Sequence, residues 1–203
     1  MIRAEGIRRV LKLADEIERA WEPAGQDSAG SVSIRPWQPA RALAGEDCYS
    51  PWAPYGIPGF LRLMLVALTA AGPGNLRLLQ VGCGPGTKLL LARDVLGLDA
   101  YGIERDPAYT AQWEAFAVQA EVADAMTWDG YGDFGIIWVF RPLRSRAMEA
   151  DLEARIWRQM APGTVIAGAN LTPGPPSSWT AAEDSQGSAR TGVWIKPENR
   201  SLP

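Results

Sequence analysis

Short apolar runs alternate with longer amphipathic stretches along the middle of the chain. The apolar runs have the length of buried strands, and the stretches between them place apolar residues at helical spacing. Strands are predicted at residues 76–81, 100–103, 121–123, 134–140 and 164–169, and helices at 87–96, 107–118 and 145–160. This alternation predicts an α/β fold, in which right-handed crossovers join a mostly parallel sheet with helices on both faces.

The region before the first strand has a different pattern. Residues 1–21 carry apolar side chains at roughly helical spacing, which predicts an amphipathic helix, and residues 22–58 combine proline and glycine with aromatic side chains. Residues 60–71 are apolar nearly all round, which predicts a buried helix ending at Gly72. We expect residues 1–58 to form an N-terminal helical and aromatic cap.

The region after the last parallel strand predicts an antiparallel hairpin. A proline-rich loop follows residue 171, and residues 178–182 and 192–196 have the character of two short strands. With 203 residues, 47% of them hydrophobic, the chain is long enough for one sizeable core. We therefore expect residues 59–203 to form the α/β domain and to make a single compact unit with the cap.

Composition excludes several classes of function. The formal charge is −3 and neither sign gathers in a block, which argues against double-stranded nucleic acid as a partner. The chain has no histidine, so Ser-His-Asp triads, Cys-His dyads and HExxH zinc sites are all excluded.

The two cysteines and the apolar segments give expectations about location. Cys48 and Cys83 offer neither a disulfide framework nor a metal-binding CxxC spacing, which favours a reducing cytoplasm and predicts no metal site. The most apolar stretch, residues 60–71, has about half the length of a membrane span, so no membrane association is expected.

A glycine-rich turn lies between the first predicted strand and the helix after it. Residues 80–87 read Gln-Val-Gly-Cys-Gly-Pro-Gly-Thr. Glycines allow close approach of the backbone to a ligand, and the helix start offers unpaired N–H groups, so a nucleotide-like ligand is indicated. In dinucleotide-binding loops the third glycine lies three residues after the second, whereas Gly86 lies two after Gly84, which disfavours NAD and FAD.

An acidic residue ends the second predicted strand. Glu104 lies twenty residues after Gly84, where its carboxylate can accept hydrogen bonds from both hydroxyls of a ribose. Arg105 follows directly and could instead bind the 2′-phosphate of NADP, but the glycine spacing argues against that cofactor. Each of these features also has an ordinary structural use, since a glycine loop can simply turn and Glu104 can cap the next helix.

The glycine loop, Glu104 and the Ala123-Asp124-Ala125 segment together resemble the class I SAM-dependent methyltransferase family over about residues 55–170. The resemblance implies a Rossmann-like methyltransferase fold, a domain that binds S-adenosyl-L-methionine (SAM), and contacts from Asp124 and Ala125 to the adenine. Gln80 departs from the family, which has an acidic residue there. The cofactor-binding residues expected from the loop, from Glu104 and from the resemblance are Tyr55, Gln80, Gly82, Cys83, Gly84, Gly86, Thr87, Glu104, Arg105, Asp124, Ala125 and Trp138.

The same resemblance places the methyl acceptor near the loop after the fourth strand. Trp52, Phe140 and Arg141 are the substrate candidates, and no catalytic residue is assigned. Arg141 could bind an anionic group of the acceptor or pair with Glu149 or Asp106. The Phe-Arg-Pro-Leu sequence at 140–143 lacks the Asn/Asp/Ser-Pro-Pro-aromatic motif of nucleic-acid amino methylases, which disfavours methylation of DNA bases.

The sequence thus predicts a SAM-dependent methyltransferase with a small-molecule acceptor, acting as a monomer or homodimer. Three alternatives stay open: a protein that binds SAM or S-adenosylhomocysteine (SAH) without catalysis, a nicotinamide-dependent oxidoreductase, and an interaction protein that uses the fold alone. The absence of an obvious general base motivates the first alternative, and the glycine loop with Arg105 motivates the second.

Overall fold

A computed structural model describes residues 57–140, 142–143, 145–172, 174–182 and 191–198. The predicted amphipathic helix at 1–21 and nearly all of the aromatic cap at 22–58 lie outside the described residues. Proposals that depend on them stay predictions.

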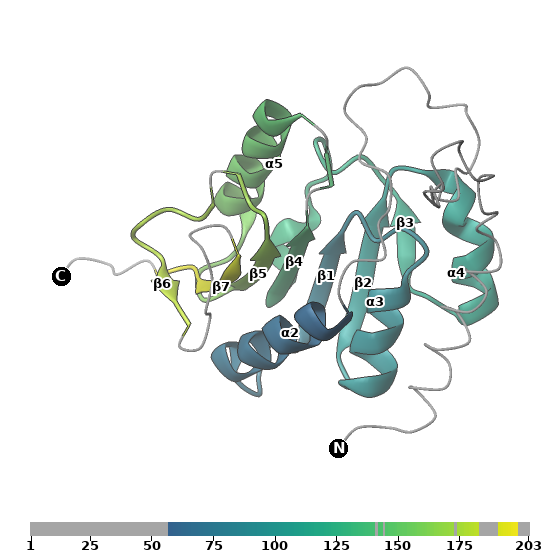
Figure 1. The fold of residues 1–203 in the computed structure, drawn as a ribbon, viewed down its shortest axis with the longest axis horizontal. Helices are drawn as coiled ribbons and strands as arrows, with labels where there is room; N and C mark the ends of the chain where they lie inside the picture. Colours follow the sequence, from purple (N-terminus) through teal and green to yellow (C-terminus); the bar gives the residue numbers. More distant parts are fainter. Residues whose placement is uncertain (1–56, 141, 144, 173, 183–190, 199–203) are drawn as a thin grey trace, which may run out of the picture.

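Seven strands form one sheet in the order β3-β2-β1-β4-β5-β7-β6 (Figure 1). β1 to β5 are parallel, while β7 is antiparallel to both β5 and β6. The mostly parallel sheet and the antiparallel C-terminal hairpin were both predicted, and both are confirmed. The strands are β1 (Arg77–Val81), β2 (Asp99–Glu104), β3 (Ala120–Val122), β4 (Ile136–Phe140), β5 (Val165–Ala169), β6 (Thr180–Ala181) and β7 (Gly192–Ile195).

Helices cover both faces of this sheet, as predicted. Successive strand residues enter two separate apolar clusters, so that Leu78 of β1 packs on one face and Leu79 on the other. The first cluster includes side chains of α2 (Ile57–Ala71), α3 (Thr87–Leu90) and α4 (Thr110–Phe116), and the second includes those of α5 (Arg146–Gln159). The sheet therefore lies between two layers, an arrangement that can be followed in Figure 1.

The helices differ in detail from their predicted forms. The helix expected at 87–96 is α-helical only to Leu90 and continues as a π-helical segment, Leu91–Val95. The one expected at 107–118 begins as a 3₁₀ turn, Pro107–Tyr109, and α4 ends at Phe116 because Ala117 is left-handed. Such segments depend on tertiary packing rather than on the spacing of apolar residues, so the sequence pattern did not reveal them.

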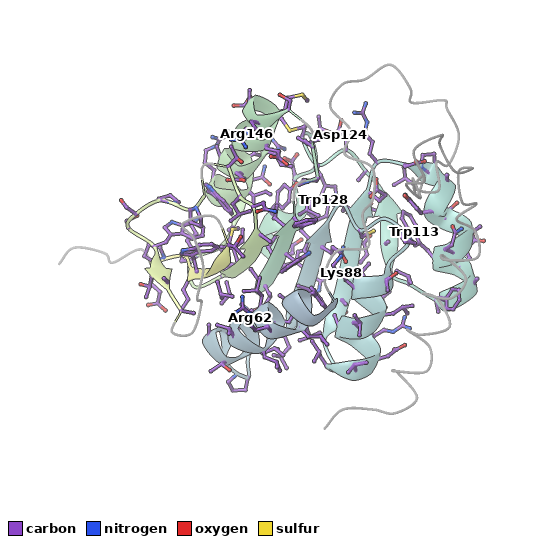
Figure 2. The ribbon with its side chains drawn as sticks, in the orientation of Figure 1. Arg62, Lys88, Trp113, Asp124, Trp128 and Arg146 are labelled. Atoms are coloured by element: carbon purple, nitrogen blue, oxygen red, sulfur yellow. The ribbon has the colours of Figure 1, made fainter. Side chains whose placement is uncertain are left out.

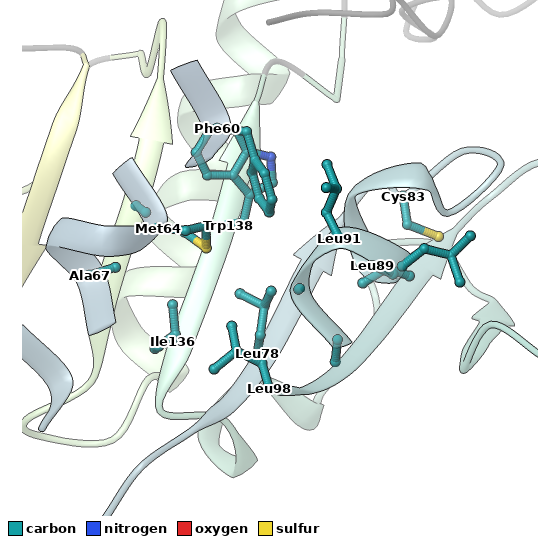
Figure 3. Close-up of a cluster of buried hydrophobic side chains, with 14 of the residues drawn as sticks. Phe60, Met64, Ala67, Leu78, Cys83, Leu89, Leu91, Leu98, Ile136 and Trp138 are labelled. Atoms are coloured by element: carbon teal, nitrogen blue, oxygen red, sulfur yellow. The ribbon is translucent and has the colours of Figure 1, made fainter. Parts of the chain in front are cut away.

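α2 packs on the sheet through one face only. Phe60, Met64 and Ala67 are buried in the first cluster, whereas Leu65 is 58% exposed. The phenyl ring of Phe60 meets the indole of Trp138 edge to face, with 5.0 Å between the ring centroids (Figure 3). The all-round apolar pattern predicted a fully buried helix, and for the outer face of α2 that prediction is wrong.

A glycine allows close packing between β2 and the elements that follow β1. A Cβ atom on Gly102 would lie 2.6 Å from Leu89 of α3 and 2.8 Å from the Cβ of Cys83 in the glycine loop. Contacts this short are not tolerated in a packed interior. Gly102 therefore sets how closely the loop and α3 approach the second strand.

We expect Gly102→Ala to lower the free energy of unfolding by about 1–3 kcal/mol, because the new methyl group displaces Cys83. Urea denaturation followed by circular dichroism measures the change. Gly59→Ala in α2 is the matched control, since a Cβ there meets nothing within 4 Å, and it should raise stability by up to about 1 kcal/mol. Equal stability of the two variants would contradict this packing argument.

Candidate functional site

The three glycines of the loop after β1 all adopt left-handed backbone conformations. Their φ values are +71° at Gly82, +53° at Gly84 and +85° at Gly86, a region that other residues enter at a cost. A Cβ on Gly86 would also lie 2.8 Å from the side chain of Val118. The spacing of the glycines thus follows from the path of the backbone, as expected for a loop that turns sharply into α3.

The loop is tied to the end of β2 by the carboxylate of Glu104. One oxygen, Oε2, accepts from the Gly84 N–H at 2.9 Å, and Oε1 accepts from the N–H groups of Arg105 at 2.8 Å and Asp106 at 3.0 Å. The loop is further held by the Ile103 carbonyl, which accepts from two loop N–H groups at 2.9 and 3.0 Å. Glu104 therefore positions the loop in addition to its predicted role toward a ribose.

The burial of Glu104 affects its protonation and its capacity to bind a ligand. The side chain is 7% exposed, and burial raises its pKa above the ordinary value, an effect that the three backbone N–H donors partly offset. A carboxylate has about four acceptor positions, and the backbone occupies three of them. Binding both hydroxyls of a ribose therefore requires one of these backbone bonds to lengthen or be shared.

Trp113 of α4 gives the loop a second anchor that sequence reasoning missed. Its indole N–H donates to the carbonyl of Gly84 at 2.8 Å in a buried setting. Gly84 is thus held on its N–H by Glu104 and on its carbonyl by Trp113. Trp113 lies within the helix predicted at 107–118, where the sequence pattern assigns it no role at the loop, although buried tryptophan N–H groups usually find an acceptor.

Two polar atoms at the two ends of the glycine loop are buried without a hydrogen-bond partner. Oε1 of Gln80 on β1 and Oγ1 of Thr87 at the start of α3 have no hydrogen bond within the described part of the chain. Buried polar atoms are nearly always paired, because an unpaired one carries a desolvation cost. Their position around the glycine loop fits a site whose ligand supplies the missing partners.

Lys88, the second residue of α3, is also buried. The residue is 7% exposed, and none of the described residues forms a hydrogen bond or an ion pair with its side chain. Burial lowers the pKa of its ammonium group from the ordinary 10.5 to about 8. Sequence reasoning missed Lys88, since a lysine in an amphipathic helix is ordinarily on the solvent side.

The segment after β3 forms a turn around Asp124. Its Oδ1 accepts from the Met126 N–H at 2.9 Å, and its carbonyl accepts from the Trp128 N–H at 2.9 Å. The Ala125 carbonyl accepts from the hydroxyl of Tyr131 at 2.8 Å. In the described structure neither Oδ2 of Asp124 nor the N–H of Ala125 is bonded, so an acceptor and a donor are both available to a ligand.

α5 holds two of the neighbouring loops in place. Arg155 donates to the carbonyls of Thr127 at 3.0 Å and Trp128 at 3.1 Å and forms an ion pair with Asp129. Glu153 accepts from the backbone N–H of Thr172 and of Gly174 beyond β5. These contacts hold the loops after β3 and β5 against α5.

The structure gathers most of the predicted cofactor residues at one edge of the sheet. The glycine loop, Glu104 with Arg105, and Asp124 with Ala125 follow the carboxyl ends of β1, β2 and β3, the edge at which open α/β sheets bind ligands. Lys88, Trp113 and Asp124 are marked in Figure 2.

The remaining predicted site residues lie on β4 or are outside the described structure. Trp138 is 2% exposed in the core beneath α2, and Phe140 at the end of β4 is partly buried against the same cluster. Tyr55, Trp52 and Arg141 lie outside the described residues, so their assignments remain predictions.

The described structure contains no cluster of three or more histidine, cysteine, aspartate or glutamate side chains able to hold a metal ion. The thiol of Cys83, a residue of the glycine loop, is buried, and burial raises its pKa. Within the same residues, every helix is too short or too polar to span a bilayer.

No protein-family model and no curated protein sequence matches this chain. Among solved structures, an RNA methyltransferase from Salinibacter ruber in complex with S-adenosyl-L-homocysteine is similar over 74% of this chain and 97% of its own, with a TM-score of 0.53 and 17% identity. DesVI of Streptomyces venezuelae is similar over 64% of this chain and 61% of its own, at a TM-score of 0.45 and 17% identity. The first likeness shows that this chain has the SAM-dependent methyltransferase fold, which confirms the predicted fold class.

We expect Trp113→Phe to loosen the glycine loop, because it removes the donor to the buried Gly84 carbonyl at a cost of about 1–2 kcal/mol. Hydrogen exchange of the Gly84 and Gly86 amides, measured by NMR, should become faster. Trp128→Phe is the control, since it removes an indole hydrogen bond to Glu121, away from the loop. Unchanged exchange at both glycines in Trp113→Phe would contradict the anchoring role.

We expect Lys88→Met to raise the free energy of unfolding at pH 7 by about 1–3 kcal/mol, because it removes a buried ammonium. Between pH 8 and 10.5 the unfolded chain binds more protons at Lys88 than the folded one, so the wild type gains stability as pH rises. The advantage of the Met variant should therefore shrink across this range in urea denaturation. A difference independent of pH would show that Lys88 is not a buried cation.

Proposed function

We propose that this protein is a SAM-dependent methyltransferase with a small-molecule acceptor. The observation that carries the proposal is the juxtaposition of three features at one sheet edge: the tethered glycine loop, the Glu104 carboxylate and the Asp124–Ala125 turn. Together they offer acceptors for ribose hydroxyls and for an adenine amino group, and a backbone donor for the adenine ring. No phosphate-binding contact is needed for such a ligand.

The residues at this edge fit the two ends of SAM. Glu104 would hold the ribose, and the free Oδ2 of Asp124 with the N–H of Ala125 would hold the adenine. Oε1 of Gln80, buried and unpaired, is an acceptor only and suits the ammonium of the amino-acid end. SAM supplies an electrophilic methyl carbon on a positively charged sulfur.

The chain's own contribution to methyl transfer is orientation and exclusion of water. The displacement releases a neutral thioether, so no residue needs to stabilise a leaving anion, and the absence of histidine is no obstacle. Phe140 ends β4, and Pro142 and Leu143 follow it; all three residues are apolar and partly buried. Pro142 lies beside the glycine loop, since its Cβ would be 3.1 Å from a Cβ on Gly82. The proposed position of the acceptor is beside these residues.

A small acceptor is favoured by charge and by sequence. The formal charge of −3, without a basic block, gives little attraction for a polyanion. The loop after β4 also lacks the polar and aromatic residues with which amino methylases hold a nucleic-acid base.

Isothermal titration calorimetry with SAM and SAH tests the proposal, with NADPH as a third ligand. We expect SAM and SAH to bind and NADPH not to bind. Glu104→Gln should weaken SAH binding by about tenfold or more, because a neutral amide is a poorer acceptor for ribose hydroxyls. Glu114→Gln, an exposed carboxylate on α4, is the matched control and should bind as the wild type does.

Each alternative predicts a different result in the same titrations. NADPH binding without SAM binding would identify a nicotinamide-dependent protein, and binding of none of the three would indicate an interaction protein. If SAM binds but mass spectrometry finds no transfer to any member of a panel of amines, phenols and carboxylates, the protein is a non-catalytic SAM-binding module.

A further inference from the structure

Lys88 and Gln80 belong to the same face of the sheet. Lys88 lies one helical turn before Leu91, and residues three apart share one side of a helix. Leu91 belongs to the same apolar cluster as Trp138 and Phe60 of α2, and all three are labelled in Figure 3. Gln80 is the register partner of Trp138 across β1 and β4.

The start of α3 also brings Lys88 to the ligand-binding edge. α3 follows β1 directly and its first residues come out of the glycine loop, so its N-terminal end lies at the carboxyl end of the strand. Lys88, the second residue of α3, and Gln80, the next-to-last residue of β1, therefore both lie near the carboxyl end of β1. Glu104 ends β2, where it is bonded to Gly84.

Three buried polar side chains near the carboxyl end of β1 lack partners among the described residues: Gln80 at its Oε1, Thr87 at its Oγ1, and Lys88, which is 7% exposed. A buried ammonium is stable only with an anionic or strongly polar partner. Gln80 is neutral and offers no charge to Lys88. The anion must therefore come from outside the described part of the protein.

We infer that Lys88 binds the carboxylate of the amino-acid end of SAM, while Gln80 accepts from its ammonium. This assignment rests on the proposed function and makes Lys88 the residue that selects an α-amino-acid end over an uncharged one. The two partners match by chemistry, because an acceptor-only atom faces the donor group and a donor-only ammonium faces the carboxylate. The hydroxyl of Thr87 is available to the same carboxylate.

Decarboxylated SAM, which keeps the sulfonium and the ammonium but lacks the carboxylate, separates this contact from the rest of the site. We expect the wild type to bind SAM at least about tenfold more tightly than decarboxylated SAM in isothermal titration calorimetry. Lys88→Met should weaken SAM binding by about tenfold and leave decarboxylated SAM within about twofold, so that the preference disappears.

Two further variants serve as controls for charge and for folding. Arg62→Met removes an exposed cation from α2 and should keep the preference for SAM. Lys88→Gln keeps a polar side chain but removes the charge, so it should lose the preference for SAM as Lys88→Met does. It is the variant to use if Lys88→Met fails to fold.

The outcomes separate this inference from the proposed function. If the Lys88 variants lose affinity for SAM and for decarboxylated SAM equally, or lose affinity for neither, the proposed role of Lys88 is overturned. SAM binding by the wild type would still support the proposed function. A wild type that binds both ligands equally would overturn the role of Lys88 as well. If the wild type binds neither ligand, the proposed function fails and this assignment fails with it.

Discussion

The bond between the Glu104 carboxylate and the glycine loop is the constraint on which the site depends. Three left-handed glycines have no preference of their own for one path, so the loop holds its shape only because Glu104, Ile103 and Trp113 tie it to β2 and α4. The three backbone donors also partly offset the rise in the pKa of Glu104 that its burial causes. The shape of the glycine loop is therefore set by the protein's own contacts, and such preorganisation lowers the entropic cost of binding.

The side chains on the two sides of the glycine loop differ in charge. On the β2 and β3 side the sheet edge presents the carboxylates of Glu104 and Asp124, which suit hydroxyl and amino donors. On the β1 side it presents the neutral Gln80 and the ammonium of Lys88. A ligand with a neutral nucleoside at one end and a zwitterion at the other matches this division in a single orientation, which sets where its central sulfur lies.

Much of the fold could be read from the sequence because its signals are local. Each strand of the parallel sheet was expected within two residues of its observed limits, and the glycine loop and Glu104 were placed by their position after strands. The hydrogen bond from Trp113 to Gly84 spans 29 residues, so no window of sequence contains it. The burial of Lys88 and of Trp138 could not be predicted for the same reason, since it depends on elements distant in the sequence, such as α2 over Trp138.

The most direct test of the proposed SAM-binding site is a crystal structure of the protein with SAH. We expect the ribose hydroxyls within hydrogen-bonding distance of Glu104, the adenine amino group at Asp124, and the amino-acid end between Gln80 and Lys88. SAH bound elsewhere, or in this place with Glu104 still bonded only to the three backbone N–H groups, would contradict the account.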